Sequence, residues 1–153
     1  MEGTLRTPRY SFEILPTPGH SDDHVCLVEP TERWVFGGDL FVHERVRYAR
    51  RDEDLRLEIL ALQAVLARDP EVLFCGHSGI VPGAAEALRR KLRYWRGLAR
   101  EAQRRRAAGE RPRAIQRGLV GREGVMRVLT GGHFSKRAFI DALLGLPADV
   151  LED

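Results

Sequence analysis

Apolar and polar positions alternate over short stretches in the first half of the chain, a pattern typical of β-strands. Residues 10–15 (YSFEIL) predict one strand, and the apolar runs 25–28 and 34–36 predict two more. Residues 30–33 form a turn between these two runs, so we expect them to pair as a hairpin. A fourth apolar run, residues 72–74, predicts another strand.

Residues 52–68 instead show helical periodicity. Asp52 is predicted to cap the helix at its N-terminus, and Asp69–Pro70 to end it. The helix would bury one face, made of Leu55, Ile59, Leu62 and Leu66. A strand, a helix and a further strand in succession predict a layered α/β fold.

The pattern becomes helical again after Gly83. A helix over residues 84–106 is predicted to bury a seam of Leu88, Leu92, Trp95, Ala99 and Ala102. Ser135 is predicted to cap a last helix over residues 136–144. We therefore divide the chain into residues 1–82, which hold the strands and one helix, and residues 83–153, a helical extension packed on them.

Composition is that of an ordinary globular chain. Of its 153 residues, 43% are hydrophobic and 31% charged. No apolar run approaches the roughly 18 residues of a membrane span, and the N-terminus has no apolar signal core, so we expect a cytoplasmic protein with no membrane partner. Cys26 and Cys75 lie inside apolar runs, and we expect buried free thiols there.

Positive charge is concentrated in one segment. Residues 89–113 contain eleven Lys or Arg against two Glu, a net +9, so the rest of the chain carries −6 of the overall +3. Arginines beside Tyr94 and Trp95 suggest an alternative function, a non-catalytic module whose basic helix (residues 84–106) contacts nucleic acid or a partner chain. Trp95 lies on the apolar seam, however, which favours a place in the core, and we do not expect nucleic acid to be the partner.

Three residues are candidates for metal ligation. His20 and His77 each follow a glycine at the end of a predicted strand, and Asp39 follows Gly37–Gly38 in the same setting. Histidine nitrogens with a carboxylate oxygen suit zinc, manganese or iron. The other histidines, His24, His43 and His133, are interpreted as structural.

These residues stand in recognisable motifs. TPGHSDDH, then FGGDLF, then FCGHSG resemble, in order and in strand context, the second half of the metallo-beta-lactamase superfamily. The resemblance implies part of an αββα sandwich, followed here by the helical C-terminal region. It implies a zinc-dependent hydrolase in which a metal-bound hydroxide attacks an ester, thioester or related substrate.

The resemblance also assigns roles within a two-metal site. His20 matches the third histidine on the first metal, Asp39 the carboxylate that bridges both metals, and His77 the histidine on the second metal. Asp22 and Asp23 directly follow His20, and either could orient its ring from outside the metal shell. A solvated turn is the alternative for these two aspartates.

The family's other ligand motif, His-x-His-x-Asp-His, is absent, because no histidine precedes His20. The chain alone thus offers each metal of a pair one histidine and a shared aspartate, fewer than the three protein ligands of catalytic zinc. We expect one zinc or none in this chain, against two in a complete site, and no activity from the chain alone. It would be a truncated hydrolase, one half of a split enzyme, or a stand-alone domain with a single metal or none.

Partners follow from this incompleteness. A sheet cut through its domain would expose an apolar face, so we expect a complementary N-terminal half or a homo-oligomer. The substrate would be a small molecule, and the basic tail favours an anionic one.

Overall fold

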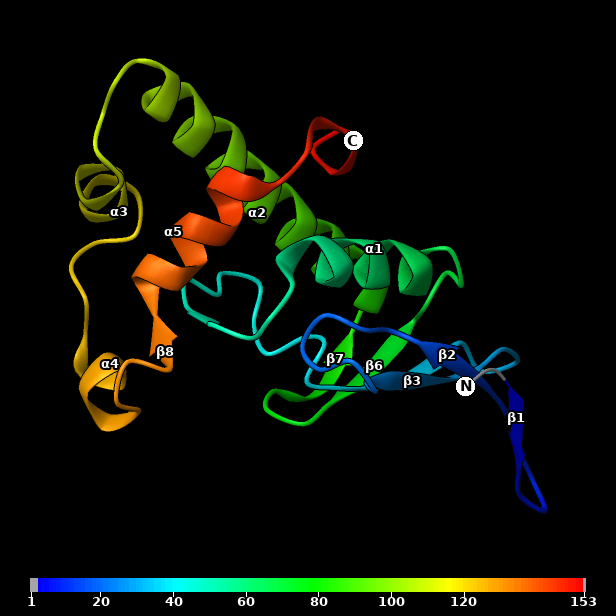
Figure 1. Ribbon diagram of the computed structural model, residues 1–153. Helices are drawn as coiled ribbons and strands as arrows, with labels where there is room; N and C mark the ends of the chain where they lie inside the picture. The colour runs from blue at the N-terminus through cyan, green and yellow to red at the C-terminus, as the bar shows by residue number, and fades with distance from the viewer. Residues whose placement is uncertain (1–2, 153) are drawn as a thin grey trace.

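The computed structural model describes residues 3–152, and its main element is a six-stranded sheet (Figure 1). The strands lie in the order β1-β2-β3-β4-β6-β7, and all neighbours are antiparallel except β4 and β6. They are β1 (Gly3–Arg6), β2 (Ser11–Pro16), β3 (Val25–Glu29), β4 (Trp34–Gly38), β6 (Val72–Cys75) and β7 (Gly79–Pro82). The predicted strands are confirmed; β1 and β7 were not expected.

Helices cover one face of the sheet. They are α1 (Leu55–Leu66), α2 (Ala84–Ala107), α3 (Pro112–Leu119), α4 (Val125–Leu129) and α5 (Lys136–Gly145), with a final 3-10 turn over Ala148–Val150. Beneath α5, the short strands β5 (Ala49–Arg50) and β8 (Phe134–Ser135) pair with each other. The α/β class expected from the sequence is therefore confirmed.

Helix α1 begins two residues later than the sequence suggested. The cap is Asp54, whose Oδ1 accepts a hydrogen bond from the Leu57 amide at 3.0 Å, and not Asp52. Asp52 is instead held by Arg50, with 2.6 Å between Nη2 and Oδ2. The prediction for the last helix is confirmed, because Ser135 Oγ accepts from the Ala138 amide.

A single hydrophobic core joins the sheet to the helical extension. Buried side chains of the sheet, such as Val35 and Leu73, belong to the same cluster as Trp95 of α2 and Phe139 of α5. Every residue of the predicted seam on α2 is buried. Both cysteines are buried and free, as expected. Within residues 3–152, no helix is long and apolar enough to cross a membrane.

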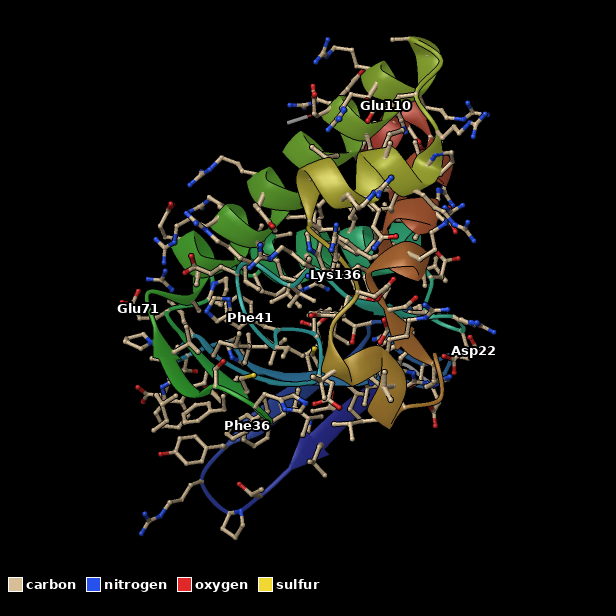
Figure 2. All side chains as sticks on the ribbon, turned by 90° about the vertical axis from the view of Figure 1, so that its left-hand side faces the viewer. Asp22, Phe36, Phe41, Glu71, Glu110 and Lys136 are labelled. Carbon is tan, nitrogen blue, oxygen red and sulfur yellow. The ribbon has the colours of Figure 1, made fainter. Side chains whose placement is uncertain are left out.

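The other face of the sheet is not covered by any helix within residues 3–152. The strand register places on it Leu5, Phe12, Ile14, Pro16, Val25, Leu27, Trp34, Phe36, Val72, Phe74, Ile80 and Pro82, together with Glu29 at the end of β3. The ring of Phe36 stacks on that of Phe74, with centroids 4.5 Å apart. Figure 2 shows Phe36 on this side, away from the helices, and Phe41 on the helix side. We call this surface the aromatic face.

Candidate metal centre

The sheet topology brings the three candidate ligands to one edge. Strands β2, β4 and β6 all run in the same direction, because β3 is antiparallel to both β2 and β4, and β4 is parallel to β6. His20, Asp39 and His77 lie on the loops that follow the C-terminal ends of these three strands. Loops held at one edge of a rigid sheet are a common setting for functional side chains.

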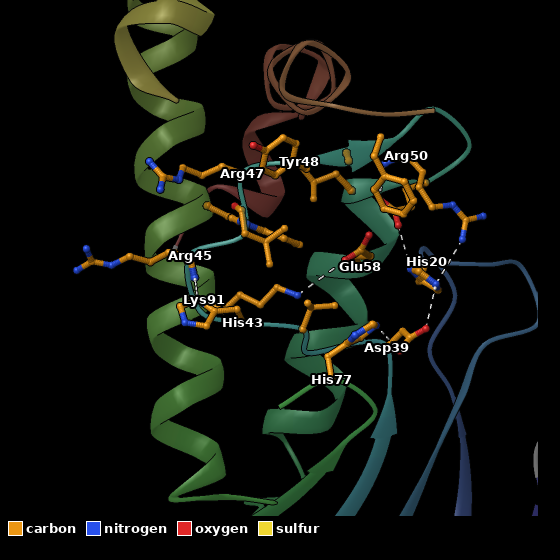
Figure 3. Close-up of a pocket in the computed structure, with 17 residues that line it drawn as sticks. His20, Asp39, His43, Arg45, Arg47, Tyr48, Arg50, Glu58, His77 and Lys91 are labelled. Carbon is orange, nitrogen blue, oxygen red and sulfur yellow. Dashed lines mark hydrogen bonds and ion pairs between the residues drawn. The ribbon is translucent and has the colours of Figure 1, made fainter. Parts of the chain in front are cut away.

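Asp39 lies between the two histidines (Figure 3). Its Oδ2 is 3.5 Å from Nε2 of His20, and its Oδ1 is 3.2 Å from Nε2 of His77. Each carboxylate oxygen therefore faces a different imidazole ring. The three side chains do not converge on one point, and among the described residues no group of three or more His, Cys, Asp or Glu has the geometry to hold a single metal ion.

Two glycines allow the chain to approach this edge closely. A Cβ atom on Gly76 would lie 3.0 Å from Oδ1 of Asp39, and the Gly76 amide donates to the Gly38 carbonyl at 2.9 Å. Gly19, before His20, has a φ of 134°, and a Cβ there would lie 2.5 Å from the backbone nitrogen of Glu58 in α1. Side chains at these positions would push the His20 loop and the Asp39 carboxylate out of place.

Glu53 holds the other side of the His20 ring. Its Oε1 lies 2.9 Å from Nδ1 of His20, and its carboxylate is mostly buried. Nη1 of Arg50 lies 3.4 Å from Nε2 of the same ring. The sequence suggested Asp22 and Asp23 for this orienting role. Among the described residues, Asp23 instead accepts a hydrogen bond from Ser21, and neither aspartate bonds to His20.

The other three histidines lie outside this arrangement. His24 is held by Thr17, with 2.8 Å between Nδ1 and Oγ1, and burial and the nearby His20 lower its pKa. His43 accepts the Arg45 amide at Nδ1, and Nε2 of His133 lies 3.5 Å from Asp52. These contacts fit the structural roles expected of them.

A pocket of about 550 Å³ opens beside the three residues, and we call it the site pocket. Its apolar wall includes Val42, Val46, Leu55, Trp95 and Phe134. Arg45 and Arg47 also line it, but their side chains extend away from His20, Asp39 and His77 (Figure 3). An apolar recess next to convergent polar groups is the usual form of a small-molecule site.

A buried charged pair lies at the base of the pocket. Nζ of Lys91 on α2 lies 4.0 Å from Oε2 of Glu58 on α1, and both side chains are almost completely buried. Lys91 also donates to the Leu40 carbonyl at 2.7 Å and lies over the Trp95 ring. Burial raises the pKa of Glu58 to about 7 and lowers that of Lys91, although each partner opposes the shift of the other.

Comparison with known proteins shows which family part of the chain matches. Residues 6–77 match the family model described as the metallo-beta-lactamase superfamily, and this segment includes His20, Asp39 and His77. Over this segment the chain resembles the metallo-beta-lactamase superfamily, so the resemblance seen in its motifs is confirmed.

Solved structures share the fold at low sequence identity. A beta-lactamase domain protein from Burkholderia ambifaria has a TM-score of 0.66 at 17% identity, and the match covers 92% of this chain and 42% of that protein. A metallo-beta-lactamase family protein from Thermus thermophilus has a TM-score of 0.64 at 16% identity, and the match covers 92% of this chain and 44% of that protein. An inverting sec-alkylsulfatase from Pseudomonas sp. has a TM-score of 0.63 at 15% identity, and the match covers 95% of this chain and 26% of that protein. The chain spans less than half the length of each of these structures.

Proposed function

We propose that this chain contributes half of the two-cation site of a metallo-beta-lactamase-type hydrolase, acting on an ester or thioester. The observation that supports the proposal is the position of Asp39, whose two oxygens face two different histidines. A carboxylate so placed suits a bridge between two cations better than one chelated ion. Each cation would take one nitrogen and one oxygen from this chain, so the remaining donors must come from outside its 153 residues.

When bound, a pair of zinc ions would polarise the substrate oxygen and make a water molecule nucleophilic near neutral pH. The chain's own residues position the components. Glu53 fixes the orientation of the His20 ring, and the loops after β4 and β6 hold Asp39 and His77 against each other. The apolar wall of the site pocket, which includes Val46 and Trp95, would take the acyl part of the substrate and exclude water from it.

The missing donors would come with a second β-layer packed on the aromatic face. An antiparallel sheet that faces water normally carries polar side chains on that face, whereas here the exposed side is apolar except at Glu29. Two sheets that pack face to face interdigitate apolar side chains of this kind. One absent layer would account both for the incomplete donor set and for the uncovered face.

Zinc binding tests the proposal. The purified chain should bind zinc weakly by equilibrium dialysis, because only half of each coordination shell is present. His20→Ala and His77→Ala should each reduce the bound zinc, and Asp39→Ala should reduce it most, since it removes a donor from both positions. His43→Ala is the matched control, because His43 lines the same pocket but lies outside the trio. Zinc binding unchanged in all three variants would disprove the proposal.

The alternative of a nucleic-acid module built on α2 is not favoured. Most basic side chains of this helix are committed within the protein: Arg89, Arg90 and Arg93 pair with Glu86, Arg104 pairs with Glu101, Arg105 pairs with Glu110, and Arg96 and Arg100 bond to the carbonyls of Val150 and Leu151. Lys91 is buried. The number of basic side chains therefore overstates how many are free to contact a phosphate backbone.

A further inference from the structure

A second cluster of arginines lies outside α2, on the flank formed by α3, α4 and the start of α5. These elements lie on the left-hand side of Figure 1, and Figure 2 looks onto that side. Residues 111–137 contain seven Lys or Arg and one acidic residue, Glu123. Residues 111–137 are therefore strongly positive, as is the segment 89–113 identified from the sequence.

Five of these arginines surround one recess. A pocket of about 540 Å³ is lined by Arg113, Arg117, Arg122, Arg127 and Arg137, with Gln116 and Glu123. We call it the arginine recess. Guanidinium groups gathered around one cavity repel each other unless an anion lies between them.

Glu123, the acidic residue of the recess, offsets only part of this charge, and within residues 3–152 it forms no ion pair with these arginines. The carboxylate of Glu123 accepts hydrogen bonds from the amides of Lys136 and Arg137, at 3.1 and 2.8 Å, and so caps the first turn of α5. Arg137 pairs with Asp141 at 2.7 Å. Across residues 3–152, no ion pair is formed by Arg113, Arg117, Arg122 or Arg127. Four guanidinium groups thus remain available to a ligand.

We propose that the arginine recess binds a diphosphate-type group of a small molecule. Guanidinium groups match phosphate oxygens with paired hydrogen bonds, and several around one recess favour a group with several anionic oxygens. Single-stranded nucleic acid would also need rings on which bases stack. No aromatic side chain lines the recess or the pocket next to it, within the described part of the chain.

The recess is also connected to the site pocket. Arg127 and Arg137 line both the recess and a neighbouring pocket, and Arg50 and Glu53 line both that neighbour and the site pocket. A ligand anchored by its diphosphate in the recess could extend along Arg50 toward Asp39. Only this connection rests on the proposed hydrolase function, and it makes the substrate a diphosphate-bearing ester or thioester.

Calorimetric titration of the metal-free full chain with inorganic pyrophosphate tests the recess. Metal-free protein is needed because pyrophosphate itself binds zinc. At about 0.1 M ionic strength, where exposed charges more than about 10 Å apart are largely screened, we expect saturable binding of one pyrophosphate per chain. Arg117→Gln/Arg122→Gln should weaken binding by about tenfold or more, since each lost guanidinium removes charge-assisted hydrogen bonds. The single variant Arg127→Gln should weaken it as well.

A charge-matched control lies at the other end of the molecule. Arg6→Gln/Arg9→Gln removes two exposed positive charges near the β1–β2 turn and should change the affinity less than about twofold. Thermal melting of each variant checks that it is folded. Absence of pyrophosphate binding, or an equal loss in the control variant, would overturn the proposal. Tighter binding of a single-stranded oligonucleotide, with the same dependence on Arg117 and Arg122, would overturn it in favour of nucleic acid.

One further variant separates the two proposals. His20→Ala should bind pyrophosphate as the unaltered chain does, because His20 does not line the recess. Loss of zinc binding with pyrophosphate binding retained supports both proposals. Pyrophosphate binding with no zinc binding in any form supports the recess alone.

Discussion

Glu53 contacts His20 on the side of the ring away from Asp39. The 2.9 Å contact of Glu53 Oε1 with Nδ1 holds the ring so that Nε2 is directed at Oδ2 of Asp39, 3.5 Å away. A carboxylate behind a ligating histidine raises the basicity of the ring and restricts its rotation. At this position, one mostly buried side chain controls the direction of a proposed ligand.

Replacing Glu53 by Gln tests this role. Glu53→Gln keeps the shape of the side chain but removes its charge, and we expect zinc affinity to fall by about 10- to 100-fold. Competition with a chromophoric chelator measures the change. Asp52→Asn is a suitable control, because Asp52 is a neighbouring carboxylate that pairs with Arg50 and His133 and not with His20. Equal zinc affinities for Glu53→Gln and the unaltered chain would exclude the orienting role.

At the scale of elements, helices α1 and α2 are joined by the buried pair of Glu58 and Lys91. Placing two charges in a nonpolar core costs several kcal/mol, which their attraction offsets only in part. The Leu40 carbonyl and the Trp95 ring supply further partners to the ammonium group. Removal of one member should therefore destabilise the folded state, because the other member remains buried without its partner.

Lys91→Met leaves Glu58 buried without its cation. Burial already raises the pKa of Glu58 to about 7, and loss of the attraction to Lys91 should raise it further. A carboxyl whose pKa is higher in the folded state binds more protons there, so the variant's stability is highest below about pH 4.5 and falls as pH rises through the folded pKa. We expect Lys91→Met to be less stable at pH 8 than at pH 5, by about 2–4 kcal/mol.

Urea unfolding at the two pH values measures this difference. Lys91→Met/Glu58→Leu removes both charges and should lose most of the pH dependence that distinguishes the single variant. A single variant with equal stability at both pH values would show that the Glu58 carboxyl is not held in a nonpolar site.

Local pattern was enough to predict most of these elements. The seam of α2 and the Ser135 cap follow from spacing alone, and both are confirmed. Helix α3 was not predicted; it begins at Pro112, and proline is favoured in a first helical turn although it breaks a helix interior. Strand β7 was missed because the apolar run between Gly79 and Pro82 is very short.

Contacts between distant segments could not be predicted in this way. Glu53 lies 33 positions after His20, and only the packing of the His20 loop on α1 brings the two together. The arginines of α2 and those of the recess look alike in the sequence, yet the first set is mostly paired and four of the second are not. Pairing depends on tertiary structure, which charge counts do not contain.

At the scale of the whole molecule, the aromatic face is the largest departure from an ordinary surface. Exposed apolar patches on monomeric proteins are usually limited to a few hundred Å² and larger ones mark interfaces. Here a whole sheet face is apolar except at Glu29, and Phe36 and Ile80 are 38% and 68% exposed. The proposed second β-layer would cover these side chains.

Without that layer, the chain should associate through the same face. Sedimentation velocity over a range of concentrations should detect self-association, and Phe36→Lys/Ile80→Lys should shift the chain toward a monomer, because charges on this face oppose burial. Val128→Lys is the control, since Val128 is 81% exposed but lies on α4, away from the sheet. A compact monomer at all concentrations, or association that persists in the double variant, would show that the aromatic face does not drive association. Association lost in the double variant alone would identify this face as the surface through which the chain associates.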